Sequence, residues 1–511
     1  MPADEYTYKQ KTKNEVRHKS IKHAIETLTT FRSEACCVRR SYVRDLYDYF
    51  VQLDETHEKE EAKKIDISYI REWEHIHTNN IGTKRPDELV VCYLSGPEPE
   101  NDFHEFISMG VKPQNIWAFE SERNTYLKAL STVDGTSFMQ PKLIKTNIER
   151  FFEMAPRTFD IVYIDACASI ISEQHALRAI ATLFKCHRLN SPGVLISNFS
   201  YLDDSTSSEK NQYIDIISRY NFIKSNRNAS LIEDCGNIRY INGFDEEKKI
   251  VEDSLIDSYG EFITSMIYNT ASIAVPTVRF CNSNYLQSLT NTLPLPVERL
   301  EFKDVNVIKD NTLHKFFFMN LFLEQNRANF DGVNKAKKLL GEMTAQQGGY
   351  DLISSMKKLH EVRFANNDIC SEIVDTVEFF NKSNSMYQFL DKPNGILFFD
   401  SVINQLSSPM HYVSDKALRF TYVAKKKRMF TDVLLFDDCR YIYDWLPAIH
   451  QIPKAFSNLS WQYTYRFALD GLIKQRLYYN NEFFFSGSVV SKTTLGFEAK
   501  KMKDRIHISQ E

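Results

Sequence analysis

The sequence lacks the cysteine spacings that mark a metal site or a disulfide framework. It holds nine cysteines in 511 residues, with no CxxC pair and no zinc-type spacing. Cys36 and Cys37 are adjacent, which suits neither an ordinary disulfide nor a metal clip. The cysteines therefore indicate reduced thiols, as in a cytosolic protein.

Long apolar runs and an N-terminal signal are also missing. Residues Met1 to Glu5 are polar and lack the apolar core of a signal peptide. The longest apolar runs, such as Phe316 to Leu323, are far shorter than the roughly 20 residues that a membrane-spanning helix needs. We expect a cytoplasmic protein that makes no membrane contact.

Neither sign of charge is in large excess, and the chain is long. The net charge of −4 gives no global attraction to nucleic acid or to an anionic membrane, so any such contact must be local. With 511 residues the chain exceeds the roughly 250 to 300 residues at which a single core stops growing. More than one domain is therefore expected.

What the sequence does contain is an alternation of apolar strands and amphipathic stretches between Glu88 and Ser200. The expected strands are residues 89–94, 115–119, 142–146, 159–165 and 194–198. Apolar side chains recur at helical spacing from Phe103 to Val111, and a second helical stretch runs from about 173 to 188. This alternation predicts an α/β fold with a Rossmann-like, doubly wound sheet.

Residues suited to a nucleotide ligand stand at the ends of the first two expected strands. The turn after the first strand contains Ser95, Gly96 and Pro97, and the second strand ends on Glu120. An acid roughly 20 residues or more past such a loop can accept hydrogen bonds from both hydroxyls of an adenosine ribose. A solvated charge is the alternative. The GxGxxG turn of nicotinamide dehydrogenases is absent, so that class ranks third.

The order and spacing of these pieces resemble the class I S-adenosylmethionine-dependent methyltransferases over residues 81–250. The resemblance implies S-adenosylmethionine as the cofactor. It implies these cofactor-binding residues: Ser95, Gly96, Pro97, Glu120, Asn147, Ile148 and Asp165. The first three match the loop that wraps the methionine part, and Glu120 matches the ribose acid. The family's loop usually holds two or three glycines, whereas this loop holds one.

The same resemblance assigns roles to the residues after the third and fourth expected strands. Asn147, which replaces the commoner Asp, and Ile148 match the pair that binds and packs on adenine. Asp165 matches the position where substrate and methyl group meet, and it is the candidate catalytic base or orienting group. The next residues, Ala166 and Cys167, match neither the Pro-Pro-aromatic segment of DNA amino-methyltransferases nor the Pro-Cys pair of cytosine C5 enzymes. A reactive thiol at Cys167 is the alternative to a buried structural cysteine.

The catechol-type O-methyltransferases are more similar at this position. Their Asp-Ala-Asp-Lys and Asp-Asn segments resemble the runs from Asp165 to Cys167 and from Ser197 to Asn198. The resemblance retains two of three magnesium ligands, Asp165 and Asn198, and puts Ser197 where a carboxylate is expected. Mg²⁺ favours hard carboxylate oxygens. A metal site is therefore an alternative, and no metal ligand is predicted.

The flanking segments carry fewer signals. Residues 1–80 are predicted to form a helical cap or dimerisation element, with a helix packed on the sheet as the alternative. Residues 212–250 are expected to supply a last helix and further strands of the sheet. Residues 251–511 form a region rich in Phe and Tyr, which indicates an α+β or mostly helical second core or a self-association surface. A homo-oligomer is therefore expected.

Two local features bear on partners and proton transfer. The basic run from Lys425 to Arg428 lies between Tyr422 and Phe430, a mixture that single-strand nucleic-acid binders use, with a solvated turn as the alternative. His175 and His187 are candidate proton acceptors, or else ordinary histidines on a helix surface.

The sequence is consistent with two functions. The first is an S-adenosylmethionine-dependent methyltransferase that acts on an unidentified O or N acceptor by in-line displacement. The second is a catalytically degenerate sensor or interaction protein with a methyltransferase fold, such as one in bacterial anti-phage defence.

Overall fold

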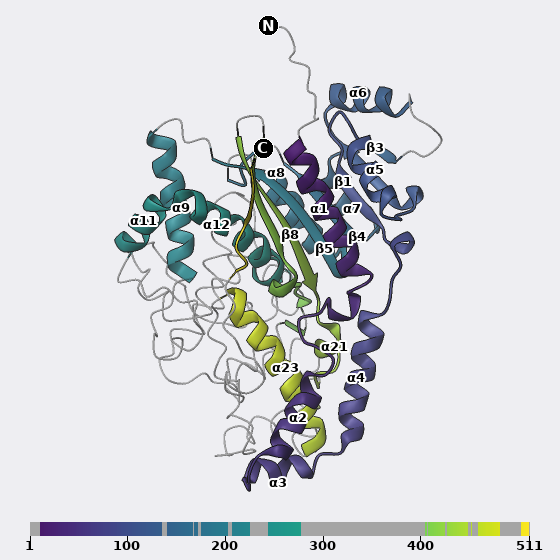
Figure 1. Cartoon of the computed structure of the whole chain (residues 1–511), viewed down its shortest axis with the longest axis vertical. Helices are drawn as coiled ribbons and strands as arrows, with labels where there is room; N and C mark the ends of the chain where they lie inside the picture. Colours follow the sequence, from purple (N-terminus) through teal and green to yellow (C-terminus); the bar gives the residue numbers. More distant parts are fainter. Residues whose placement is uncertain are drawn as a thin grey trace, which may run out of the picture.

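One mixed sheet organises the part of the chain that the computed structural model describes (Figure 1). The described residues are 11–134, 141–166, 168–171, 175–202, 207–224, 244–276, 279, 404–405, 407–424, 427–447, 451, 458–480 and 502–509. Within these ranges, no helix combines the length and the apolar character that crossing a bilayer requires.

The first five strands are parallel and confirm the predicted alternation. They are β1 (Val91–Leu94), β2 (Ile116–Glu120), β3 (Lys142–Lys145), β4 (Phe159–Asp165) and β5 (Leu189–Ser200). The helices that connect them are α5 (Glu100–Ser108), α6 (Arg123–Asp134), α7 (Ile148–Met154) and α8 (His175–Lys185). Their spatial order is β3-β2-β1-β4-β5, so the strand order reverses between β1 and β4. This mostly parallel α/β sheet is compatible with a Rossmann-like fold.

The remaining strands of the sheet come from much later in the chain than expected. They are β6 (His411–Tyr412), β7 (Leu418–Ala424), β8 (Lys427–Asp437) and β9 (Ile506–Ile508). β8 pairs antiparallel with β5, from Gly193 opposite Phe436 to Ser200 opposite Met429. β7 pairs antiparallel with β8, and β9 pairs parallel with β7. The sheet therefore extends across the predicted boundary at residue 250.

The expectation of strands within residues 212–250 is not met where the structure describes them. The described parts are helical: α9 (Ser207–Lys224) and the start of α11 (Phe244–Asp253), while residues 225–243 lie outside the described ranges. β8 occupies the place beside β5 instead, and almost all of its residues are buried, as in a strand covered on both faces.

Helices cover both faces of the sheet. On one face, α1 (Lys11–Leu28) packs through Ile21, Ala24, Ile25 and Leu28. On the other face lie α7, α8, α9 and α12 (Leu255–Asn269), which continues into a π-helical segment, Thr270–Ala274. Alternate residues of β4 face opposite sides: Tyr163 packs in the core on the α1 face, and Val162 packs in the core on the opposite face.

A third core lies beside the sheet and is built from an early and a late part of the chain. It combines α2 (Tyr42–Gln52), α3 (His57–Lys63) and α4 (Ile67–Ile81) with α21 (Arg440–Tyr443) and α23 (Leu459–Asn480). Figure 1 shows these helices together at the end of the molecule away from α6. The shorter helical turns of the fold are Arg32–Glu34, Pro86–Glu88, Pro113–Asn115 and Ser414–Lys416.

Described residues of the two flanking regions share one core. Residues from 36 to 81 do not cap the sheet alone, because their apolar faces meet aromatic residues such as Tyr463 and Phe467 of α23. The C-terminal region correspondingly forms no core of its own within its described part: β7 and β8 join the sheet and α23 joins α2 and α4. The aromatic runs at 316–318 and 398–399 lie outside the described residues. The expected homo-oligomer remains a prediction.

A buried ionic network fixes the C-terminal strand to the sheet. Asp432 on β8 accepts hydrogen bonds from Thr264 Oγ1 on α12 at 2.5 Å and from Arg505 Nη2 at 3.1 Å. Arg505 Nη1 also lies 2.5 Å from Asp432 Oδ1, and Arg419 Nε lies 3.8 Å from that same oxygen. Burial lowers the pKa of Arg505 to about 10, with Asp432 opposing the effect. One carboxylate thus holds α12, β7, β8 and the segment before β9 together.

Candidate functional site

A cavity of about 620 Å³ opens at the carboxyl edge of the parallel strands. Its walls come from the turns that follow β1, β2, β3 and β4, together with α1 and the start of α8. The cavity spans the β1–β4 boundary, where the strand order reverses, and ligands of open α/β sheets bind at such a point. Its volume falls within the roughly 300 to 1,000 Å³ of small-molecule sites.

The structure brings together nearly all of the predicted cofactor residues. Those that line the cavity are Ser95, Gly96, Glu120, Asn147, Ile148 and Asp165. Pro97 is not among the lining residues. Its carbonyl oxygen instead lies 3.5 Å from the hydroxyl of Thr132 on α6, which donates to it.

Specific contacts hold the β1 loop in place. Gly96 has a φ of 57°, in the left-handed region where a residue without a Cβ is unstrained. The Ser95 amide donates to the carbonyl of Phe119 at 3.0 Å, which joins the loop to β2. The Tyr93 hydroxyl donates to the carbonyl of Pro99 at 2.6 Å. The loop is therefore fixed by contacts to its neighbours although it contains a single glycine.

Glu120 stands at the tip of β2 and has one carboxylate oxygen in local use. Its Oε1 accepts a hydrogen bond from the amide of Glu122 at 2.8 Å. Its Oε2 has no hydrogen-bond partner within the described part of the chain. The half-buried carboxylate can therefore accept hydrogen bonds from a ligand hydroxyl in the cavity.

Asn147 has a structural role that the sequence did not suggest. It is the N-cap of α7, and its Oδ1 accepts a hydrogen bond from the amide of Glu149 at 2.8 Å. This contact occupies the amide oxygen but leaves the exposed amide NH₂ group for a ligand. The neighbouring Ile148 is buried and offers an apolar surface to the cavity.

Asp165 at the tip of β4 is paired on both carboxylate oxygens. Lys13 Nζ of α1 lies 2.8 Å from Oδ2, and Asn198 Nδ2 donates to Oδ1 at 2.6 Å. Burial by itself raises the pKa of this carboxyl, but Lys13, Asn198 and Arg17 outweigh it and lower the pKa below its usual value. Asp165 is therefore held ionised, which favours orientation of a substrate over general-base catalysis.

The residues that would complete a magnesium site do not fit one. Asn198 is fully buried, and its Oδ1 already accepts hydrogen bonds from Thr431 Oγ1 at 2.9 Å and Tyr422 Oη at 3.3 Å. Ser197 is also buried, and neither residue lines the cavity. Of the three positions compared with magnesium ligands, Asp165 alone therefore offers a carboxylate oxygen to the cavity. Cys167 lies outside the described residues.

His175 lines the cavity but is not arranged to accept a proton. Arg178 Nη2 contacts His175 Nδ1, and because a guanidinium can only donate, Nδ1 must be the acceptor. The ring hydrogen of neutral His175 is then on Nε2, where it can donate to a ligand. His187 follows the C-terminal end of α8, just before the start of β5 and so away from the cavity. Burial, together with Arg279 and Arg188, lowers the pKa of His187 to about 4.

Helix α1 contributes two site residues that the sequence analysis did not identify. Lys13 binds Asp165, and Arg17 lines the cavity and donates from Nε to Asp102 Oδ1 at 2.7 Å. The sequence does carry a signal for them. Positions 13, 17, 21, 24 and 28 follow helical spacing, so the two basic residues extend the buried apolar stripe of α1.

Lys427 and Arg428 of the basic run are the first residues of β8, and residues 425–426 are outside the described ranges. The two rings that flank it, Tyr422 and Phe430, are 3% and 1% exposed. They pack into the fold and are not available for stacking on bases. Contact with nucleic acid remains a prediction.

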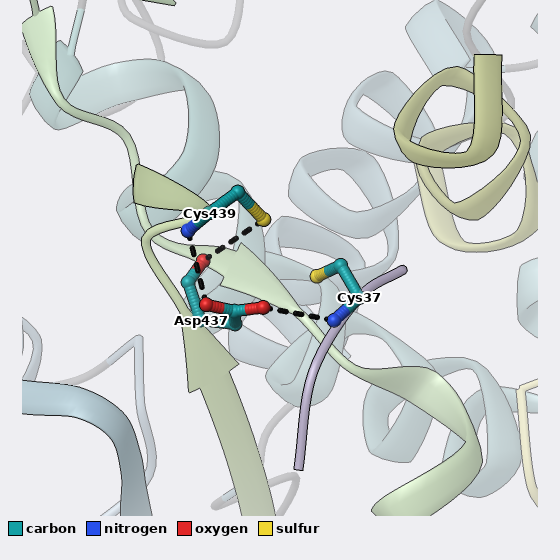
Figure 2. Close-up of side chains that lie close together, drawn as sticks. All are labelled: Cys37, Asp437 and Cys439. Atoms are coloured by element: carbon teal, nitrogen blue, oxygen red, sulfur yellow. Dashed lines mark hydrogen bonds between the residues drawn. The ribbon is translucent and has the colours of Figure 1, made fainter. Parts of the chain in front are cut away.

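A second cluster, made of two cysteines and an aspartate, joins the N-terminal segment to the end of β8. Figure 2 shows Cys37, Asp437 and Cys439, whose ligand atoms lie within 4.8 Å of one another. Asp437 accepts hydrogen bonds from the amides of Cys37 and Cys439 at 2.8 and 3.0 Å. It also accepts from Tyr441 Oη at 2.7 Å and Ser191 Oγ at 3.2 Å.

These contacts define a structural junction. Protein donors fill all four acceptor positions of the Asp437 carboxylate. Burial raises the pKa of Cys37 to about 11 and that of Cys439 well above its usual value, so both thiols stay protonated near neutral pH. A metal centre would need free carboxylate oxygens and thiolates.

Comparisons with known proteins identify no family for this chain. Neither a scan against protein-family models nor a search of curated proteins found a match. Among solved structures, one match is described as "Crystal structure of a putative caffeoyl-CoA O-methyltransferase from Staphylococcus aureus", with 16% sequence identity. The match covers 44% of this chain and 88% of that one, with a TM-score of 0.18. A likeness at this level carries no argument about activity.

Proposed function

We propose that this chain is an S-adenosylmethionine-dependent methyltransferase that acts on an O or N acceptor. The observation that carries the proposal is the convergence of Gly96, Glu120, Asn147 and Asp165 on one cavity. These residues lie at the carboxyl ends of four separate strands, and the sequence resemblance assigns all of them to one ligand. The cavity also lies at the edge of the sheet where the fold binds nucleotides.

The charges around the cavity support a cationic ligand. The described lining holds the carboxylates of Glu98, Asp102, Glu120 and Asp165 against the single guanidinium of Arg17. Arg17 neutralises Asp102, and Lys13 neutralises Asp165. Glu98 and Glu120 remain as net negative charge, which favours a sulfonium that also carries an ammonium group. The pyrophosphate of a nicotinamide dinucleotide would be repelled there.

The residues of this chain would act mainly by positioning. When bound, the cofactor supplies an electrophilic methyl group. Glu120 would accept hydrogen bonds from the ribose, and the Asn147 amide with Ile148 would contact the adenine. Asp165, held ionised by Lys13, would accept a hydrogen bond from the acceptor and orient its lone pair. His175 would donate from Nε2 to a neighbouring acceptor atom.

A ligand sensor without transfer activity is the second candidate function. The fixed ion pair between Lys13 and Asp165 favours it, because a carboxylate with a lowered pKa is a weak base. In that case the cavity binds the same cofactor but no methyl group leaves it.

Titration calorimetry of the purified chain tests the cofactor. S-adenosylmethionine and S-adenosylhomocysteine should both bind, and NAD should not. Binding of NAD alone would overturn the proposal. Incubation with radiolabelled cofactor and cellular RNA, DNA, protein and small-molecule fractions then separates the two candidates. Tight cofactor binding without label in any fraction would favour the sensor.

A further inference from the structure

Arg17 of α1 is buried at the cavity wall with part of its hydrogen-bonding capacity unused. The residue is 5% exposed and lines the cavity. Its Nε donates to Asp102 at 2.7 Å, and its Nη1 donates to Asn14 at 2.7 Å. Its Nη2 has no partner among the residues that the structure describes. Nη2 is not among the fully buried side-chain atoms that lack a partner, so it keeps some exposure at the cavity wall and can donate to a ligand there.

The pairing with Asp102 fixes both the charge and the orientation of Arg17. Burial lowers the pKa of Arg17, but Asp102, Tyr163 and Asp165 outweigh burial and raise the pKa above its usual value. Arg17 is therefore always cationic. Asp102 lies in the first turn of α5, directly after the β1 loop, so Arg17 stands beside the loop that the resemblance assigns to the methionine part of the cofactor.

Glu98 supplies the complementary charge on the same loop. It lines the cavity, and its Oε2 accepts a hydrogen bond from Asn101 Nδ2 at 3.0 Å. The unused Nη2 donor of Arg17 and the carboxylate of Glu98 match the two ends of an α-amino acid group. A guanidinium binds a carboxylate through directed hydrogen bonds, whereas a glutamate pairs with an ammonium.

We propose that Arg17 is a specificity-determining residue that binds the carboxylate of the cofactor's amino acid group, with Glu98 facing its ammonium group. This assignment rests on the proposed function. It makes α1 part of the binding site, and it gives the chain a means of distinguishing S-adenosylmethionine from adenosine compounds that lack the carboxylate.

The test compares two ligands that differ by that carboxylate alone. Calorimetry should show that the parent protein binds S-adenosylmethionine about 10-fold or more tightly than its decarboxylated form, the ratio expected for a hydrogen bond between charged groups. In Arg17→Lys, the ammonium can retain the ion pair with Asp102 but has no second nitrogen for the ligand. This variant should bind the two ligands with nearly equal affinity.

Lys19→Ala serves as the matched control, because Lys19 lies on the exposed face of the same helix and, among the described residues, pairs with Glu15 alone. This variant should keep the parent's preference. Thermal unfolding of each variant verifies that it is folded. If the parent binds both ligands equally, or if Arg17→Lys weakens both by the same factor, Arg17 only supports the loop and the inference is overturned. If the parent binds neither ligand, the proposed function itself fails.

Discussion

Lys13 and Asp165 form an ion pair with an Nζ to Oδ2 distance of 2.8 Å, which joins the first described helix to the tip of the fourth strand. The side chains are 10% and 16% exposed, so the pair is largely shielded from water. Arg17, one turn farther along α1, forms a second ion pair with Asp102 of α5. The two ion pairs attach this helix to two different walls of the cavity. The helix therefore contributes to the site as well as to the core.

Replacing Lys13 by Met should destabilise the fold by about 3 kcal/mol at pH 7, because the Asp165 carboxylate would remain buried without its cation. The pKa of Asp165 is lowered in the folded state, so the stabilisation is present above the unfolded pKa of about 3.9 and is lost as the pH falls through the folded value. Urea unfolding should therefore show that parent and variant converge below about pH 4. Lys19→Ala, which removes an exposed pair with Glu15, should cost less than about 1 kcal/mol. A difference that persists unchanged at low pH would contradict this assignment.

Replacing Glu120 by Ala should weaken S-adenosylmethionine binding by about 1.5 to 3 kcal/mol, because a charged acceptor for the ribose hydroxyls is lost. Glu122→Ala is the matched control: this exposed carboxylate accepts from the amides of Asn124 and Thr125 and does not line the cavity. Calorimetry should show near-parent affinity for the control. Equal dissociation constants for Glu120→Ala and the parent would remove Glu120 from the site.

Asp165→Asn should leave cofactor affinity within about threefold and lower turnover roughly a hundredfold or more, the effect of losing one orienting or acid–base group. The asparagine can still receive the hydrogen bond from Asn198 but no longer carries the charge that Lys13 balances. Methyl transfer to an identified acceptor is the measurement, with Glu122→Gln as the control. Retention of full turnover would show that Asp165 is only a structural partner of α1.

Asp432→Ala should destabilise the fold by roughly 3 to 5 kcal/mol, because Arg505 and Arg419 would be left buried without a counter-ion. Chemical denaturation at pH 7 measures the loss. Asp444→Ala, which removes a surface pair with Arg440, should cost less than about 1 kcal/mol. A small effect at Asp432 would mean that the two guanidinium groups find other partners.

A fragment limited to residues 81–250 should fail to form a soluble, cooperatively folded domain. Its β5 strand is buried along nearly its whole length and would lose its partner β8, which leaves an apolar edge open to aggregation. Size-exclusion chromatography and thermal unfolding beside the whole chain measure the outcome. A monomeric fragment with a sharp unfolding transition would show that the predicted boundary at 250 is sufficient.

Local signals were enough to predict the parallel half of the sheet. β1, β2 and β4 are short apolar segments between polar turns, and their carboxyl ends fix where Glu120 and Asp165 stand. The partner of β5 could not be predicted in this way. Pairing between Ser200 and Met429 joins residues far apart in the sequence, and the apolar pattern of β8 does not specify which strand it meets.

The candidate site likewise contains residues that local sequence patterns predict and residues that they do not. Glu120 and Asp165 follow strands, so strand order predicted their neighbourhood, and the cavity contains both. Lys13 and Arg17 belong to a helix whose docking depends on contacts with β5, β7 and β8, strands that include the late ones. Their role depends on tertiary contacts that no local pattern encodes.

The position of β8 far after β5 in the sequence has a consequence during protein synthesis. At 5–20 residues per second, the ribosome needs roughly 10 to 45 seconds to extend the chain from Ser200 to Lys427. Throughout that interval the growing chain carries the unpaired edge of β5, and α1 lacks the strands that it contacts beyond β5. We therefore expect the nascent polypeptide to be a strong client of ribosome-associated chaperones until the hairpin of β7 and β8 emerges from the exit tunnel.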